Sequence, residues 1–165
     1  MKNRSWNILI VSLLLIGLIS IMLTIFLGQA KENFPKKITV SSNGVTERIL
    51  SVRDLQLVPT ESREYSTNLF CEASGSYFIY LDYVEGVDGG MKHFVDVVVK
   101  ANNEVVYLGP LVDLLDGDKV IEFEGELYEK EPLAVTIRYV MPYHIGNEAQ
   151  GTYADFDIHL KIQKS

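Results

Sequence analysis

The sequence predicts an all-β protein: an antiparallel, jelly-roll-like β-sandwich preceded by one N-terminal transmembrane or signal helix. Three observations support this prediction. Residues 8–27 form an uncharged apolar run, apolar and polar residues alternate with a period of two over much of the chain after residue 38, and turn-forming residues separate the alternating stretches at short intervals. Because no helical stripe of useful length follows residue 38, the exported part is expected to consist of strands.

The apolar run begins at Ile8 and ends at Leu27, and its 20 residues would form a helix about 30 Å long, which matches a hydrocarbon core. Lys2 and Arg4 precede the run, so the positive-inside rule keeps the N-terminus in the cytoplasm. The run is longer than the apolar core of a removable signal, although a small-x-small cleavage pattern ends at Ala30. We therefore expect a single-pass membrane protein with an extracellular C-terminal domain, which becomes a secreted protein if the chain is cleaved after Ala30.

This prediction divides the chain into a signal anchor or signal peptide (residues 1–30), a short polar linker (31–37) and an extracellular domain (38–165). The whole chain has a net charge of -7, but residues 31–165 carry 13 basic and 22 acidic side chains, hence -9. An acidic domain without a basic patch is repelled by phosphates, which excludes nucleic acid as a partner. The single cysteine, Cys71, allows no intramolecular disulfide, so we expect it to be buried in an apolar core.

Alternation is clearest at residues 133–141 and 154–162, and each stretch predicts a half-buried strand. Tight hairpins are predicted at Asn43-Gly44 and Asn102-Asn103, and a wider loop at residues 87–90. Eight or nine short strands favour a jelly-roll-like or immunoglobulin-like sandwich. The remaining predicted elements are strands at residues 48–58, 65–72, 77–85, 93–100, 104–108 and 120–127, and one or two helical turns at 110–116.

Catalytic and metal-binding motifs are absent from the sequence, which predicts a protein that is not an enzyme. The chain has no HExxH, nucleophile-elbow, Walker A or GxGxxG motif, and its histidines, His93, His144 and His159, have no zinc-ligand spacing. We expect no cofactor, with calcium or a zinc site built from distant loops as alternatives. The calcium candidates are the carboxylates around the Gly117 turn, whose spacing matches no EF-hand: Asp113, Asp116, Asp118 and Glu122.

Residues 141–151, with the sequence MPYHIGNEAQG, are the most distinctive part of the chain. The glycines allow backbone conformations closed to other residues, and the polar side chains can satisfy loop amides and carbonyls, so we interpret the segment as a structural corner rather than a binding site. Its defining residues are Met141, Pro142, Gly146, Asn147, Glu148, Gln150 and Gly151. The segment resembles the C-terminal signature of the TasA/camelysin family of exported Gram-positive bacterial proteins, in which a G-N-E-x-Q-G loop precedes the last strand. Residues 111–115 are similar to a short family element before a glycine turn.

The resemblance implies a jelly-roll domain, secretion and a role in the extracellular matrix or in fibres. Members of this family assemble when one subunit donates its N-terminal strand to the next, and residues 38–49 would be that strand after cleavage near Ala30. We therefore expect a non-enzymatic role in matrix or envelope assembly, with the membrane and other surface or matrix proteins, including further copies of the chain, as partners. Two alternatives remain, a camelysin-type metal-dependent peptidase and a glycan-binding module.

Overall fold

The computed structural model describes residues 37–41 and 45–165, and it is an all-β protein. The described residues belong to one compact unit. Strands make up most of the described residues, with a short α-helix, α2 (Leu111–Leu115), and two 3₁₀ turns, η1 (Met91–His93) and η2 (Asn147–Ala149). The strands are β1 (Lys37–Val40), β2 (Val45–Leu55), β3 (Ser62–Cys71), β4 (Gly75–Gly89), β5 (Asp96–Ala101), β6 (Glu104–Pro110), β7 (Ile121–Leu127), β8 (Leu133–Val140) and β9 (Tyr153–Lys164).

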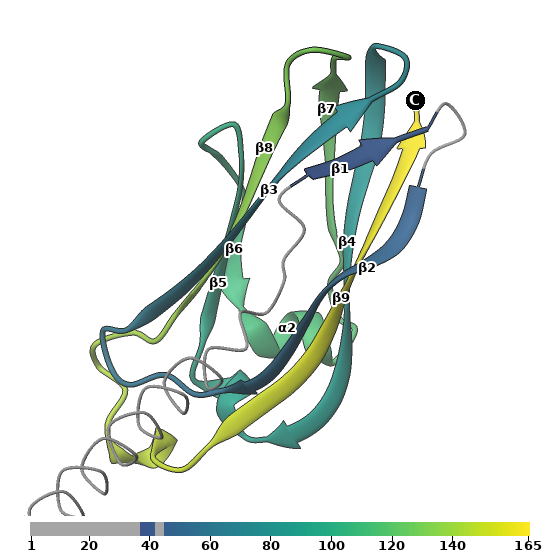
Figure 1. The fold of residues 1–165 in the computed structure, drawn as a ribbon. Coiled ribbons are helices and arrows are strands. Elements are labelled where there is room, and N and C mark those ends of the chain that lie inside the picture. Colours follow the sequence, from purple (N-terminus) through teal and green to yellow (C-terminus); the bar gives the residue numbers. More distant parts are fainter. Residues whose placement is uncertain (1–36, 42–44) are drawn as a thin grey trace, which may run out of the picture. The chain divides into compact units, whose positions relative to one another are not determined.

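The strands form two sheets, one of five strands in the order β1-β3-β8-β5-β6 and one of four in the order β2-β9-β4-β7 (Figure 1). All neighbours are antiparallel except β1 and β3, which are parallel. Lys37 pairs with Asn68 and Val40 with Cys71, so β1 accompanies only the last four residues of β3. Figure 1 shows α2 at one end of the strands, where its buried leucines contact β4, β6 and η1.

The predicted alternation is confirmed at residues 133–141 and 154–162, because every second residue of these two stretches is buried. In β8 the side chains of Leu133, Val135, Ile137 and Tyr139 are buried, and those between them are at least partly exposed. Cys71 is buried as expected, at the end of β3. The hairpin at Asn102-Asn103 is also confirmed, since both residues have positive φ and join β5 to β6. Residues 110–116 contain the predicted short helix, α2.

The two sheets share one hydrophobic core, and three aromatic residues join them across it. Tyr139 belongs to the five-stranded sheet, and its ring centroid lies 5.5 Å from that of Phe156 in the four-stranded sheet. The Tyr139 hydroxyl also lies 3.2 Å from the hydroxyl of Tyr83, so each of these buried polar groups has a partner. Burial raises the pKa of Tyr83 well above its usual value, because a phenolate has little solvation there.

The hairpin predicted at Asn43-Gly44 lies outside the described residues. The strands on either side of it do not pair with each other, since β1 pairs with β3 and β2 pairs with β9 in the other sheet. The described parts of residues 38–49 therefore belong to strands of two different sheets. The prediction of a loop at residues 87–90 was wrong, since β4 continues to Gly89 opposite Tyr153 after a bulge.

The predicted strand at residues 93–100 begins only at Asp96, because His93 ends the turn η1. Lys37, assigned to the linker, is the first residue of β1.

The predicted N-terminal helix, its span from Ile8 to Leu27 and the cleavage position after Ala30 lie outside the described residues. In the part of the chain that the structure describes, no helix has the length and apolarity needed to cross a membrane.

Candidate functional site

The distinctive loop connects β8 to β9 and is fastened to the β2–β3 connection by backbone hydrogen bonds. The Thr60 amide donates to the Met141 carbonyl at 3.0 Å, and the Met141 amide donates to the Glu61 carbonyl at 3.1 Å. The Thr152 hydroxyl donates to the Ala149 carbonyl at 2.7 Å and closes the other end of the loop. These bonds hold the loop as a corner and place it beside residues 57–59.

The motif residues divide into an inner and an outer group. Met141 and Ala149 are buried, and Pro142 is half-buried, so these three residues anchor the corner in the core. Gly151 has a φ of +77°, which favours glycine. The carboxamides and the remaining glycine face solvent: Gly146, Asn147 and Gln150.

Glu148 is held by its own loop. Backbone hydrogen bonds from Glu148 and Gly146 lower the pKa of the Glu148 carboxyl, and His144 lowers it further. A Cβ at Gly146 would lie 2.7 Å from the Glu148 Oε2 atom, so a side chain there would displace this carboxylate. In the sequence Gly146-Asn147-Glu148, the Glu148 carboxylate therefore accepts hydrogen bonds from the backbone of its own loop.

We expect the pKa of the Glu148 carboxyl to be lower than that of a glutamate in an unfolded chain. NMR of the carboxyl carbon in the isotope-labelled protein measures this pKa. The variant Glu148→Gln identifies the resonance. Because the folded-state pKa is lowered, this group stabilises the loop above the unfolded pKa, and the stabilisation is lost as the pH falls through the folded pKa. A titration at or above the unfolded value would show that the loop amides do not bind the carboxylate.

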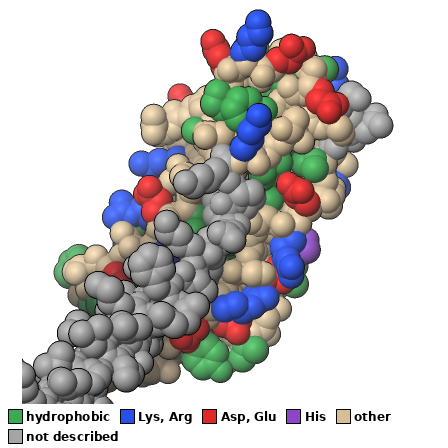
Figure 2. Space-filling model, in the orientation of Figure 1, with side chains coloured by type: hydrophobic (Ala, Val, Ile, Leu, Met, Phe, Trp, Pro, Cys, Tyr) green, Lys and Arg blue, Asp and Glu red, His purple; other side chains and the backbone are tan. Residues whose placement is uncertain are grey.

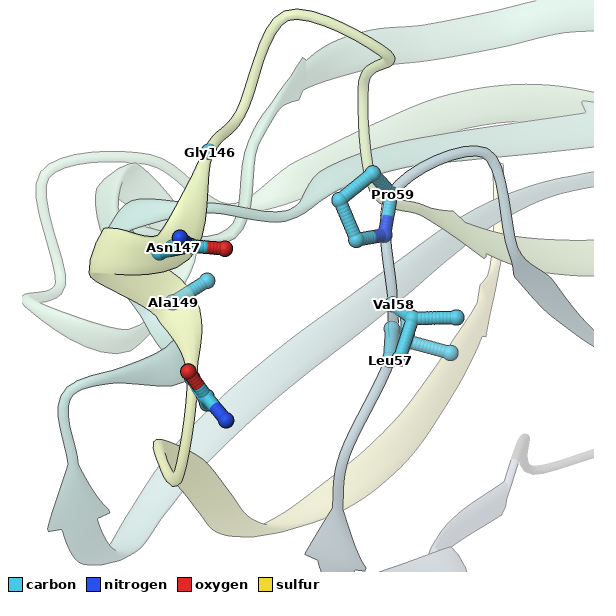
Figure 3. A pocket seen from close by; sticks show the side chains of 7 residues that line it. Leu57, Val58, Pro59, Gly146, Asn147 and Ala149 are labelled. Atoms are coloured by element: carbon cyan, nitrogen blue, oxygen red, sulfur yellow. The ribbon is translucent and has the colours of Figure 1, made fainter.

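The loop and the β2–β3 connection together enclose a pocket of about 240 Å³ (Figure 3). Figure 3 shows Val58 and Pro59 on one wall, opposite Asn147 and Ala149. All seven lining residues are apolar residues, glycine or carboxamides: Leu57, Val58, Pro59, Gly146, Asn147, Ala149 and Gln150. Such a lining binds through apolar contact and amide hydrogen bonds, and it offers no nucleophile or general acid.

Apolar side chains near the pocket are unusually exposed. Val58 is 64 % exposed on the pocket wall, and Tyr143 is 83 % exposed on the same loop as the motif. The Tyr143 ring packs edge-on against His144, with centroids 5.8 Å apart.

The four calcium candidates are not brought together. Asp113 accepts a hydrogen bond from Lys119 at 2.6 Å, and Asp116 accepts one from Lys92 at 2.8 Å. Asp118 and Glu122 are exposed. Residues 37–41 and 45–165 contain no group of three or more His, Cys, Asp or Glu placed to hold a metal ion, for zinc as for calcium.

A buried lysine, which the sequence pattern did not reveal, lies near the same helix. The Lys92 side chain is only 8 % exposed, and its ammonium lies 2.7 Å from Glu85, 2.8 Å from Asp116 and 3.2 Å from Asp88. Hydrogen bonds to Asp116 and Glu85 raise the pKa of Lys92. The Gly90 amide and Lys92 lower the pKa of Asp88. This cluster ties β4 to η1 and to the end of α2, and we assign it a structural role.

The described part of the chain is thus an all-β domain with a surface pocket between the motif loop and the β2–β3 connection. No model of a known protein family matches the chain, and no curated protein matches it.

Proposed function

We propose that the chain is a cell-surface protein, anchored by residues 8–27 or secreted after cleavage behind Ala30. Its β domain has a non-enzymatic role in the assembly of the extracellular matrix or envelope. The observation that carries this proposal is the pocket that the motif loop forms with Leu57, Val58 and Pro59. Its apolar and amide lining suits contact with another protein, and the exposed Val58 and Tyr143 extend the apolar surface beside it.

A jelly-roll-like sandwich is part of the proposal, and the strand order supports it. One sheet has the order β2-β9-β4-β7, and the other has β3-β8-β5-β6 with β1 added at its edge. Eight strands in this order correspond to two Greek keys, the arrangement of a jelly roll. The aromatic contacts between Tyr139 and Phe156 further support two sheets packed on one core.

Assembly by strand addition is the mode of association that the family resemblance suggests, and β1 is the segment suited to it. β1 has four residues and lies at a sheet edge, where it pairs with one strand. A short parallel edge strand contributes few hydrogen bonds, so the same segment of another copy could replace it at little cost. Only Ile38 and Val40 of β1 are buried, which limits what an exchange would disturb.

The experiment that tests the proposal compares two valines with similar exposure in different places. Val58→Lys puts a charge on the pocket wall, and Val84→Lys puts the same charge on β4 in the four-stranded sheet. We expect Val58→Lys to lower, several-fold, the amount of the chain recovered in high-molecular-mass surface assemblies, because a lysine cannot be desolvated in an apolar contact. Val84→Lys should leave that amount unchanged. Equal effects of the two variants, with unchanged thermal unfolding, would reject the pocket as a contact site.

A further inference from the structure

The edge strand β7 combines an open side with a row of carboxylates. β7 lies at the edge of the four-stranded sheet, where β4 is its one neighbour among the described strands. Every second residue of β7 is an exposed glutamate: Glu122, Glu124 and Glu126. An edge strand has unpaired amides and carbonyls on its open side, so β7 can take up a further strand.

The surroundings of β7 are acidic. Residues 118–131 carry six carboxylates and two lysines, a net charge of -4. On the neighbouring segments of β4, β5, β6 and β9, three acidic and three basic side chains balance one another: Asp82, Asp96, Glu104, Lys100, Lys161 and Lys164. By contrast, on the face that Figure 2 shows, acidic and basic side chains are scattered among each other. The charge at β7 therefore favours a basic partner.

The three glutamates have no basic partner within the described part of the chain. None of its ion pairs involves Glu122, Glu124 or Glu126. The Ser76 hydroxyl lies 2.9 Å from a Glu124 oxygen and 2.8 Å from a Glu126 oxygen, but it has a single proton to donate. One of these two carboxylates therefore receives no hydrogen bond from the serine, and basic side chains of another chain would compensate the charge.

The spacing of the glutamates matches that of a basic strand. They repeat every two residues, which is roughly 7 Å along β7. Side chains on one face of an added strand have the same repeat, so a lysine or arginine at every second position would lie opposite one carboxylate each. Opposite charges in this position stabilise a strand pair, and like charges destabilise it.

The inner side of the same edge favours apolar residues in the added strand. Phe123 of β7 packs against the core but is half-exposed. Val106 and Tyr107 are half-exposed in the same way on β6, which contacts β7. Because side chains on a strand alternate between its faces, the residues between the basic ones would point to this side and cover Phe123. The edge therefore suits a strand in which basic and apolar residues alternate.

We infer that β7 binds an extended segment of another protein, in which basic residues alternate with apolar ones. The segment adds a fifth strand to the four-stranded sheet, which is recognition by strand addition. A second copy does not fit, because no described strand of this chain has basic residues at three alternate positions. Two β7 strands would also repel each other. The contact goes beyond the proposed function, since it uses neither the motif pocket nor β1.

Two peptides of identical composition, TKVKVKVT and TKKKVVVT, test this contact. Both carry three lysines, but only the first presents them at every second position. In fluorescence anisotropy with the full chain in a non-ionic detergent at low salt, the alternating peptide should bind at least tenfold more tightly. Equal binding of the two peptides, or binding of neither, would overturn the inference, because a general attraction between opposite charges does not depend on the order of the residues.

A pair of charge reversals locates the binding on β7. Glu124→Lys reverses the central charge of β7, and Glu47→Lys makes the same change on β2, at the opposite edge of the sheet. Both side chains are exposed, so both variants should unfold at the temperature of the parent chain. Glu124→Lys should raise the Kd of the alternating peptide at least tenfold, and Glu47→Lys should change it less than twofold. Similar effects of the two variants would contradict binding at β7.

Zero-length cross-linking locates the peptide on the parent chain without any substitution. A carbodiimide joins a lysine amine of the alternating peptide to a carboxylate that touches it, and mass spectrometry of the digested protein identifies that carboxylate. Glu122, Glu124 and Glu126 should carry most of the peptide. Adducts mainly outside residues 118–131 would overturn the site. In the absence of peptide, a dimer linked through the same three glutamates would overturn the choice of partner in favour of a second copy.

Discussion

Phe156→Ala should lower the free energy of unfolding by about 3–5 kcal/mol. Phe156 is fully buried, and its ring contacts those of Tyr83 in the same sheet and Tyr139 in the other sheet. The substitution removes these contacts and leaves a cavity that the strands cannot close, because both tyrosines are fixed by pairing within their own sheets. Chemical denaturation followed by circular dichroism measures the change.

Phe78→Ala is the matched control for this prediction. Phe78 lies on β4 of the same sheet and is 36 % exposed, so its loss should cost about 1 kcal/mol or less. If the two substitutions had similar effects, the two sheets would not share the core described above.

Lys92→Met should destabilise the protein by about 2 kcal/mol at neutral pH. This destabilisation is smaller than that caused by removing one partner of a fully buried ion pair, because the three carboxylates are partly exposed. The substitution keeps the apolar stem but leaves Glu85, Asp88 and Asp116 facing one another without a cation. Lys92 helps to lower the pKa of Asp88, so the parent chain loses the stabilisation of this pair as the pH falls through the folded pKa of Asp88, and the difference between the variant and the parent chain should shrink in acid. Thermal unfolding measured from neutral pH into acid checks both parts.

Lys119→Met is the control for Lys92. Lys119 pairs with Asp113, but its side chain is 54 % exposed, and such pairs contribute little. We expect a much smaller change in the unfolding temperature, with no strong dependence on pH. If Lys92→Met were as mild as Lys119→Met, the cluster would not hold α2 and η1 to β4.

The pH dependence of the parent chain follows from the same cluster. The pKa of Asp88 is lowered in the folded state, so its contribution to stability is present above the unfolded pKa and is lost as the pH falls through the folded pKa. Stability should therefore fall in acid.

Local patterns in the sequence predicted those elements whose formation depends on neighbouring residues. The alternation at Leu133, Val135 and Ile137 predicted β8, because side chains on a strand alternate between its two faces. Asn102 and Asn103 predicted the β5–β6 turn, since asparagine tolerates positive φ. Periodicity reports which face of a strand is buried, but it does not report which strand lies beside it. The placement of β1 against β3 could not be predicted for that reason.

The candidate site was predicted in part. The motif at Gly146 and Gly151 indicated a corner between the last two strands, and the structure places the loop there. The opposite wall of the pocket, at Leu57, comes from a connection about ninety residues earlier in the chain, so no local pattern could join the two. The burial of Lys92 could not be predicted for the same reason. Glu85 and Asp88 are near Lys92 in the sequence, but Asp116 contacts it only because α2 packs beside η1.

We propose that the β domain lies on the outer side of the cell membrane. Labelling of a single exposed cysteine in intact cells tests this location most directly. Val84→Cys is made in the full chain, where Cys71 is buried and should stay unlabelled. A membrane-impermeant maleimide should label the variant in intact cells as completely as it does after lysis, and the parent chain should remain unlabelled in both. Labelling of Val84→Cys only after lysis would place the domain inside the cell and contradict the proposed function.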